Sequence, residues 1–234
     1  MASDTSFSQR AEKFLKGMDF TTITEEEEKK RETEERERQK KEAFRSSGVG
    51  EKYLEYTLDD FKTDTDEQRS ALDAVRTYIQ DIRDGKPRSL WLTGTPGTGK
   101  TMLACLLTKE LGGRYRKSYR LINEARQADS FSGSEDRNTL IDRYAGYRHL
   151  VIDEVGKDTG YKSDEWNILW QILNERYEQD KPTVLVSNLT KRELAEYLGA
   201  HIVDRFTETC RVIEFTGSSY RKVLRRGTDD NCKD

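Results

Sequence analysis

Long apolar runs and cysteines are both scarce in this sequence, and each scarcity excludes a class of protein. No apolar run approaches the roughly 20 residues that a membrane-spanning helix requires. The opening stretch MASDTSFSQRAEKF contains no apolar core of a signal peptide. Only three cysteines occur, Cys105, Cys210 and Cys232; their odd number and wide spacing support neither a disulfide framework nor a zinc site. We therefore expect a soluble, cytoplasmic protein with no membrane partner.

An excess of positive charge is also missing. The 234 residues include 41 Lys and Arg against 44 Asp and Glu, a net charge of −3. Such a chain has no global positive field for duplex DNA, so any nucleic-acid contact must use a local basic patch. Neither His149 nor His201 has a partner at metal-ligand spacing.

Charged residues reach 36%, whereas apolar ones make up only 33%, which indicates a solvated segment. Residues 25–45 read EEEEKKRETEERERQKKEAFR, with glutamates four positions before basic residues. This order favours an exposed helix, and we interpret residues 1–45 as a projecting helical arm. A disordered linker or a merely solvated helix remains the alternative. Five apolar side chains upstream either dock on a partner or pack on the chain's own domain: Phe7, Phe14, Leu15, Met18 and Phe20.

The stretch SSGVG at 46–50 indicates a flexible joint within a linker spanning 46–57. It is followed by a main domain over 58–224 and a flexible tail over 225–234. Within the domain, helical spacing predicts a helix over 65–82 whose N-cap is Thr65 or Asp66. The remaining pattern alternates. Strands are expected at 89–94, 115–122, 149–156, 183–188 and 211–215, and helices at 100–111, 137–147, 163–180, 191–198 and 201–208. The alternation predicts an α/β fold with a parallel sheet flanked by helices.

A glycine-rich loop joins the first strand to the next helix. It satisfies the pattern G-x-x-x-x-G-K-[ST] and predicts a phosphate site. Backbone N–H groups would surround the phosphates at the positive end of the helix. Lys100 would neutralise the β and γ phosphates, and the Thr101 hydroxyl would bind Mg²⁺, so the expected cofactors are ATP and Mg²⁺. The predicted nucleotide-binding residues are Gly94, Thr95, Pro96, Gly97, Thr98, Gly99, Lys100, Thr101 and Met102.

Polar residues also end two later strands. HLVIDEVG ends in Asp153 and Glu154, where open parallel sheets place their ligands. We expect Asp153 to bind the magnesium through water and Glu154 to polarise the attacking water. VLVSN ends in Ser187 and Asn188, and an amide there could contact the γ-phosphate. Each feature has a simpler reading, an acidic strand end in solvent for the first and a common turn for the second.

Several motifs in this order resemble the AAA+ ATPases of the bacterial helicase-loader type, the DnaC/IstB-like family. They are GTPGTGKT, LVIDEVG, SN at 187–188, IVDRF at 202–206 and SSYR at 218–221, with FRSSGV, YTLDDF and QRSALDAVRTYI upstream. The resemblance covers roughly residues 32–224 and implies a P-loop AAA+ fold behind the arm.

The resemblance also implies roles for residues that the local pattern leaves unassigned. Asn188 takes the position of sensor 1, and Arg221 that of sensor 2. Arg205 takes the position of an arginine finger that acts on ATP held by the neighbouring subunit. With Lys100 and Glu154, these three complete the expected catalytic set. For each arginine alone, a surface salt bridge would be the more common explanation.

Three partners follow from the resemblance: a hexameric replicative helicase gripped by the arm, single-stranded DNA, and further copies of this chain. The implied activity is loading of the helicase onto DNA during replication, with ATP hydrolysis completed between subunits. The DNA-contacting element of such loaders corresponds here to EARQADSFSGSEDR, which offers Arg126, Phe131 and Arg137. A plain surface loop is the alternative for that segment.

Other functions remain open on the same residues. An IstB-like transposition helper would share the strand-end motifs but bind duplex DNA and a transposase. A P-loop metabolite kinase would require a substrate pocket and a lid. A non-enzymatic adaptor would use ATP only as a switch, although the intact Glu154 speaks against lost hydrolysis.

Overall fold

A five-stranded, entirely parallel sheet forms the centre of the main domain. The computed structural model describes residues 25–86, 88–128, 135–157 and 162–220. The sheet order is β2-β3-β4-β1-β5. The strands are β1 (Ser89–Gly94), β2 (Arg114–Lys117), β3 (Leu150–Val155), β4 (Thr183–Ser187) and β5 (Cys210–Phe215). The predicted α/β class with a parallel sheet is confirmed.

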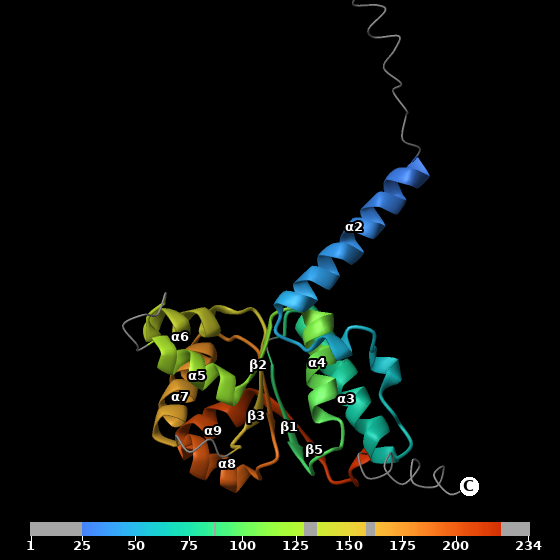
Figure 1. The fold of residues 1–234 in the computed structure, drawn as a ribbon. Coiled ribbons are helices and arrows are strands. Elements are labelled where there is room, and N and C mark those ends of the chain that lie inside the picture. Colours follow the sequence, from blue (N-terminus) through green and yellow to red (C-terminus); the bar gives the residue numbers. More distant parts are fainter. Residues whose placement is uncertain (1–24, 87, 129–134, 158–161, 221–234) are drawn as a thin grey trace, which may run out of the picture. The chain divides into compact units, whose positions relative to one another are not determined.

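Helices cover both faces of this sheet (Figure 1). The α-helices are α2 (Glu25–Ser46), α3 (Asp66–Arg83), α4 (Lys100–Leu111), α5 (Ser118–Ala128), α6 (Arg137–Gly146), α7 (Lys162–Glu178), α8 (Lys191–Leu198) and α9 (Ala200–Thr209). Two short 3₁₀ helices, η1 (Glu51–Tyr53) and η2 (Leu58–Asp60), precede α3. Helices α3 and α4 pack on one face, and α5 to α9 pack on the other.

The strand sequences divide their side chains between two cores. In β1, Leu90 and Leu92 enter the core beneath α3 and α4, whereas Trp91 enters the core beneath α5 to α9. Successive side chains of a strand point to opposite faces, and both faces here are covered. All three residues are therefore buried, and the strand reads as a continuous apolar run.

The opening helix begins where its sequence predicts. Thr65 is the N-cap of α3: its Oγ1 accepts from Gln68 N at 3.3 Å, while Gln68 Oε1 accepts from Thr65 N at 3.0 Å. This reciprocal pair satisfies two backbone donors that the first helical turn leaves unpaired.

The second strand differs from its prediction. The segment expected as one strand over 115–122 divides after Lys117 into β2 and α5. From Ser118 onward, Leu121, Ile122 and Ala125 are buried on one side of a helix. The β-favouring residues of this stretch indicated a strand, but packing against the second core determined its structure.

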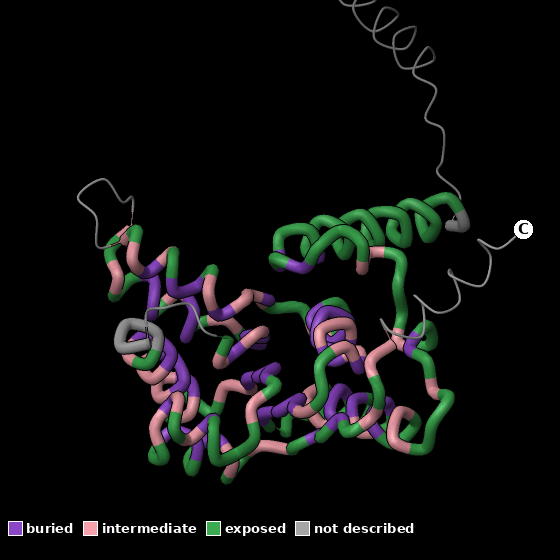
Figure 2. The backbone as a smooth tube through the Cα atoms, turned by 60° about the horizontal axis from the view of Figure 1, so that its bottom comes forward, coloured by how far each residue is buried: buried purple, intermediate pink, exposed green. Residues whose placement is uncertain are grey.

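Residues 25–46 of the chain form the helix α2, and the last turn of this helix belongs to the domain. Contacts divide the chain after Lys41 into two units. Every residue from 27 to 43 is exposed (Figure 2), as the charge pattern predicts. Phe44, by contrast, is buried in the core beneath α3 and α4. The predicted boundaries at 45, 57 and 224 stay predictions.

The predicted flexible joint is held in place. Ser47 and Val49 are buried, and the Ser47 carbonyl accepts a hydrogen bond from Tyr115 N at 2.8 Å. A β-carbon on Gly48, at φ +89°, would lie 2.5 Å from the Tyr115 carbonyl oxygen. The small residues that suggested flexibility instead allow close packing against β2.

The described residues can be searched for membrane spans, disulfides and metal clusters. Among them, no helix is long and apolar enough to span a membrane. Cys105 and Cys210 are free thiols. No cluster of three metal-binding side chains of the His, Cys, Asp or Glu type is found in the part of the chain that the structure describes.

A buried histidine makes the stability of the fold depend on pH. His149 lies with Nε2 3.2 Å from the Tyr78 hydroxyl. Burial, and then the charge of Arg176, lowers the pKa of His149 from 6.5 to about 3. Because the folded pKa lies below the unfolded one, the stabilisation is complete above 6.5 and is lost as pH falls toward 3. We expect this group alone to reduce the free energy of unfolding by about 2 kcal/mol at about pH 5.

Urea denaturation at a series of pH values checks this expectation. The variant His149→Gln carries no titrating ring, so its free energy of unfolding should fall less steeply below about pH 6.5. Identical pH slopes for the two proteins would contradict the assignment, whatever their absolute stabilities.

Candidate nucleotide-binding site

A cleft of about 390 Å³ lies at the carboxyl ends of β1, β3 and β4. Its volume falls within the range of ordinary ligand sites. The predicted site residues that line it are Pro96, Gly97, Gly99, Lys100, Thr101, Met102, Asp153, Glu154 and Asn188. The structure thus brings together side chains from three strand ends, as the sequence predicts for a parallel sheet.

Glycines shape the loop between β1 and α4. Gly97 has a φ of +84°, and a β-carbon there would lie 2.1 Å from Ser219 Oγ. Gly94 has a φ of +105°, and a β-carbon there would lie 2.2 Å from the Phe215 carbonyl oxygen. Both positions therefore require glycine. The loop is fixed from outside as well, since Tyr220 N donates to the Gly97 carbonyl at 3.0 Å.

Lys100 occupies the centre of this loop. Its Nζ donates to the carbonyls of Gly94 and Thr95, each at 2.7 Å, and the residue is buried. Burial lowers the pKa of Lys100 to about 8, while the negative charge of Asp153 opposes this shift. An ammonium group that only backbone carbonyls hold can exchange them for phosphate oxygens, which carry more negative charge.

The remaining loop residues lie around this lysine. Thr98 Oγ1 donates to the Thr95 carbonyl at 2.9 Å. Thr98 also lines a separate cavity of about 160 Å³, formed by the start of α3 and residues 215–220. Gly94, Thr95 and Thr98 are thus backbone or supporting members of the loop rather than lining residues of the main cleft.

Asp153 is buried and oriented by two donors. It accepts a hydrogen bond from the Tyr115 hydroxyl at 2.6 Å and one from Glu154 N at 2.8 Å. Burial raises the pKa of Tyr115, so its hydroxyl keeps the proton that it donates. Thr101 lines the same cleft. A threonine hydroxyl and a carboxylate are oxygen donors of the kind that Mg²⁺ prefers, so the residues present fit this ion.

Glu154 has an unusual backbone. Its φ is +60°, and the register between β3 and β4 shifts between Ile152 and Val155. Positive φ is rare for a residue with a side chain, and bulges near sites redirect side chains. The strain marks Glu154 as a functional candidate.

Two lysines hold the Glu154 carboxylate. Lys117 Nζ donates to Oε1 at 2.9 Å, and Lys157 Nζ lies 3.5 Å from Oε2. Burial alone would raise the pKa of Glu154, but the hydrogen bond and charge of Lys117, with Lys157, outweigh burial and lower it. The carboxylate is therefore ionised at neutral pH, as a general base requires.

Sequence reasoning missed Lys117 and Tyr115. Lys117 ends β2 and pairs in register with Asp153 of β3, so it reaches the same sheet edge as the acidic residues. The signal was present, since a basic residue at a strand end is typical of a phosphate or carboxylate site. The predicted strand over 115–122 placed Lys117 inside a strand and concealed it.

Asn188 follows β4 and is exposed at the cleft. The preceding Ser187 is buried and anchors the strand end: its hydroxyl donates to the Val155 carbonyl at 2.7 Å and accepts from Leu189 N at 3.1 Å. This position agrees with the sensor role inferred for Asn188, which stays a prediction.

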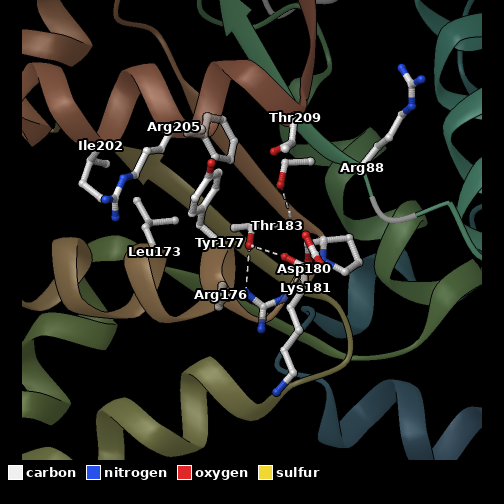
Figure 3. A pocket seen from close by; sticks show the side chains of 13 residues that line it. Arg88, Leu173, Arg176, Tyr177, Asp180, Lys181, Thr183, Ile202, Arg205 and Thr209 are labelled. Carbon is white, nitrogen blue, oxygen red and sulfur yellow. Dashed lines mark hydrogen bonds between the residues drawn. The ribbon is translucent and has the colours of Figure 1, made fainter.

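Arg205 lies far from this cleft. It lines a small pocket at the amino ends of β1 and β4, to which Ser89 and Thr183 also contribute. Figure 3 shows Arg205 and Thr183 in this pocket. A strand of five or six residues spans about 17–20 Å, which an arginine side chain cannot bridge. Arg205 therefore cannot reach the nucleotide cleft of its own subunit. Arg221, the predicted sensor 2, lies outside the described residues.

Two of the three predicted DNA-binding residues lie on either side of residues 129–134, which are not described. Arg126 lies near the end of α5 and Arg137 begins α6, while Phe131 falls outside the described residues. The structure thus places the two arginines on adjacent helices that contact each other. Their role toward DNA stays a prediction.

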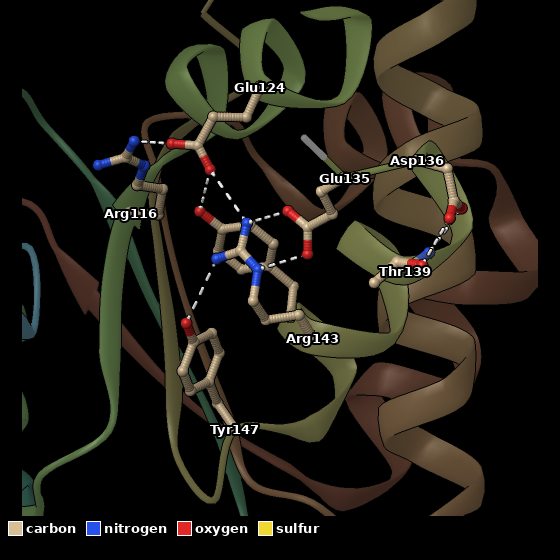
Figure 4. A network of polar contacts seen from close by, with 8 residues as sticks. Arg116, Glu124, Glu135, Asp136, Thr139, Arg143 and Tyr147 are labelled. Atoms are coloured by element: carbon tan, nitrogen blue, oxygen red, sulfur yellow. Dashed lines mark hydrogen bonds and ion pairs between the residues drawn. The ribbon is translucent and has the colours of Figure 1, made fainter. Parts of the chain in front are cut away.

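A polar network joins these two helices to β2 (Figure 4). Arg143 of α6 binds both carboxylate oxygens of Glu135, through Nε and Nη2, each at 2.9 Å. Glu124 of α5 forms an ion pair with Arg116 of β2 and accepts from the Tyr144 hydroxyl at 2.7 Å. The network fixes the α5–α6 pair beside the strand that carries Lys117.

Comparison with known proteins gives consistent results. Residues 2–228 match the family described as IstB-like ATP binding protein. Replicative helicase loader DnaC of Escherichia coli (strain K12) is 31% identical over 168 residues, covering 69% of this chain and 67% of the loader. The crystal structure of the DnaC helicase loader gives a TM-score of 0.63 at 20% identity, covering 71% of this chain and all of that one. Replication initiator DnaA bound to AMPPCP and single-stranded DNA gives 0.56 at 20% identity, covering 78% and 56%. The two structural similarities establish a shared fold.

Proposed function

Because the chain belongs to the family of IstB-like ATP binding proteins, we propose that it is an ATP-dependent loader of a replicative DNA helicase. The observation that carries this proposal is the single cleft in which Lys100, Asp153 and Glu154 meet, in a chain similar to the helicase loader DnaC. Loading would place the helicase on single-stranded DNA during replication.

The residues of the cleft divide the chemistry of ATP hydrolysis among themselves. Lys100 and the N-terminus of α4 would bind the phosphates, and Thr101 and Asp153 would hold the Mg²⁺ ion. Bound Mg²⁺ would neutralise charge that develops on the phosphoryl oxygens. Glu154, ionised by its lysine neighbours, accepts a proton from the attacking water.

Arg205 completes the site of a neighbouring subunit in this proposal. Its position at the opposite end of the sheet from Lys100 supports action in trans. The same position disfavours a metabolite kinase, in which arginines of the same chain promote phosphoryl transfer at the cleft. Turnover should therefore depend on assembly.

The partners are argued from separate parts of the chain. The exposed, charged residues 27–43 form a helix, and we propose that this arm docks on the hexameric helicase. Arg126, Phe131 and Arg137 would contact single-stranded DNA, supported by the position of the two arginines on adjacent helices.

Size-exclusion chromatography with the host's replicative helicase tests this function. We expect the full chain to co-elute with the helicase in the presence of ATP and Mg²⁺, because docking uses the arm. Deletion of residues 1–41 should abolish co-elution. This deletion keeps Phe44, which is buried in the core, so the domain stays intact.

Two results would contradict the proposal. Co-elution of the helicase with a truncated protein that still binds ATP would rule out docking through the arm. Retention of a transposase rather than the helicase would favour the IstB-like transposition helper, which shares the family and the cleft. A matched deletion of residues 225–234 should leave co-elution unchanged.

A further inference from the structure

The environment of Arg205 contains no direct carboxylate partner in the part of the chain that the structure describes. Its Nη1 donates to the Asn174 side-chain oxygen, and its guanidinium carbon lies 5.5 Å from the centre of the Tyr177 ring. Both partners are neutral and project from α7, which packs against α9. Arg205 therefore forms no surface salt bridge with any of the described residues.

Two nearby glutamates, Glu178 and Glu208, accept hydrogen bonds from Asn174 and Tyr177. Asn174 Nδ2 donates to Glu178 Oε1 at 2.9 Å, and the Tyr177 hydroxyl donates to Glu208 Oε2 at 2.8 Å. These bonds orient the amide oxygen and the ring toward Arg205. Among the described residues, neither glutamate forms an ion pair with Arg205; each instead accepts a hydrogen bond from one of its neutral partners.

Arg176 in the same pocket shows the contrasting arrangement. It is buried, and its guanidinium donates to Thr183 Oγ1 and to four carbonyls, those of Tyr144, Ala145, Tyr147 and Pro182. Its donors are therefore used within the fold. Arg205 is exposed and keeps donors available for another molecule (Figure 3).

We propose that Asn174 and Tyr177 are positioning residues that hold Arg205 in the conformation from which it reaches the nucleotide of a neighbouring subunit. This inference rests on the proposed role of Arg205 in trans. A long side chain that is fixed before docking loses less freedom when the subunits meet, and small displacements from the reactive geometry cost rate steeply. Neutral partners supply this order without competing with phosphate for the charge.

Mixed assemblies of two inactive variants separate the subunit that gives the arginine from the one that holds ATP. Glu154→Gln subunits bind ATP and provide Arg205, whereas Arg205→Ala subunits provide Glu154. In a random equal mixture, about a quarter of the interfaces combine both intact residues, because the contact between neighbours is head-to-tail. We expect turnover to reappear in the mixture at about that fraction of wild type.

Tyr177→Ala or Asn174→Leu is then introduced into one of the two variant subunits at a time. In the Glu154→Gln subunit, either change should lower kcat of the mixture by about tenfold or more with KM for ATP unchanged. In the Arg205→Ala subunit, the same change should have no effect, since that subunit has no arginine to position. Tyr177→Phe in the Glu154→Gln subunit should cost less activity than Tyr177→Ala, because the ring remains although its bond to Glu208 is lost.

A substitution elsewhere on α7 serves as the matched control. Gln171→Leu alters the same helix at a side chain that bonds Asn167, and it should leave both mixtures unchanged. Equal losses from the two placements would overturn the positioning role while leaving the proposed function standing. A mixture that regains no turnover would overturn the role of Arg205 in trans, and the positioning role with it.

Discussion

Replacing Arg205 with alanine is expected to lower ATP turnover by about a thousandfold, because an arginine that meets the γ-phosphoryl group in trans contributes roughly 10³ to 10⁵ to kcat. ATP affinity should stay at the wild-type level, since Arg205 lines a pocket at the other end of the sheet from Lys100. Steady-state turnover at several protein concentrations, together with calorimetric ATP binding, measures both quantities.

The control for this substitution is Arg192→Ala. Arg192 is an exposed arginine of α8 that pairs with Glu196 at 3.1 Å within the same helix. Its loss should leave turnover unchanged, because such surface pairs contribute little. An Arg205→Ala protein that binds ATP and keeps full activity would refute the role in trans.

Replacing Glu154 with glutamine should lower turnover by about a hundredfold or more, because the amide cannot accept the proton of the attacking water. ATP binding should persist, since the phosphate contacts of the loop and Lys100 are unchanged. Single-turnover hydrolysis under saturating ATP separates this chemical step from binding.

Glu196→Gln removes an exposed carboxylate of α8 and serves as the comparison. It should behave as wild type. If Glu154→Gln hydrolysed ATP normally, the base would have to be another group, and the bulge at the end of β3 would need a different explanation.

The contiguous parts of the site could be predicted from the sequence. The loop from Gly94 to Thr101 is one uninterrupted motif, and its helix follows at Lys100 as expected. Asp153 and Asn188 were placed because an apolar run ends beside them, and strand ends in a parallel sheet meet at one edge. The structure brings these residues into one cleft, while their catalytic roles stay predictions.

Contacts between distant segments could not be predicted in this way. Lys117 meets Glu154 only because β2 stops there and α5 begins, a boundary that tertiary packing sets against local propensity. The contacts of Arg176 could not be predicted from the sequence either, since most of its acceptors are backbone carbonyls that any sequence would supply.

Two hydrogen bonds join the segment after α2 to the acidic end of β3. Directly after α2, the Ser47 carbonyl accepts a hydrogen bond from Tyr115 N, and the hydroxyl of the same tyrosine donates to Asp153. The single aromatic side chain of Tyr115 thus connects Ser47 to the acidic end of β3. Tension applied at Ser47 would reach Asp153, the proposed metal ligand, after only two hydrogen bonds, with no flexible loop in between to absorb it.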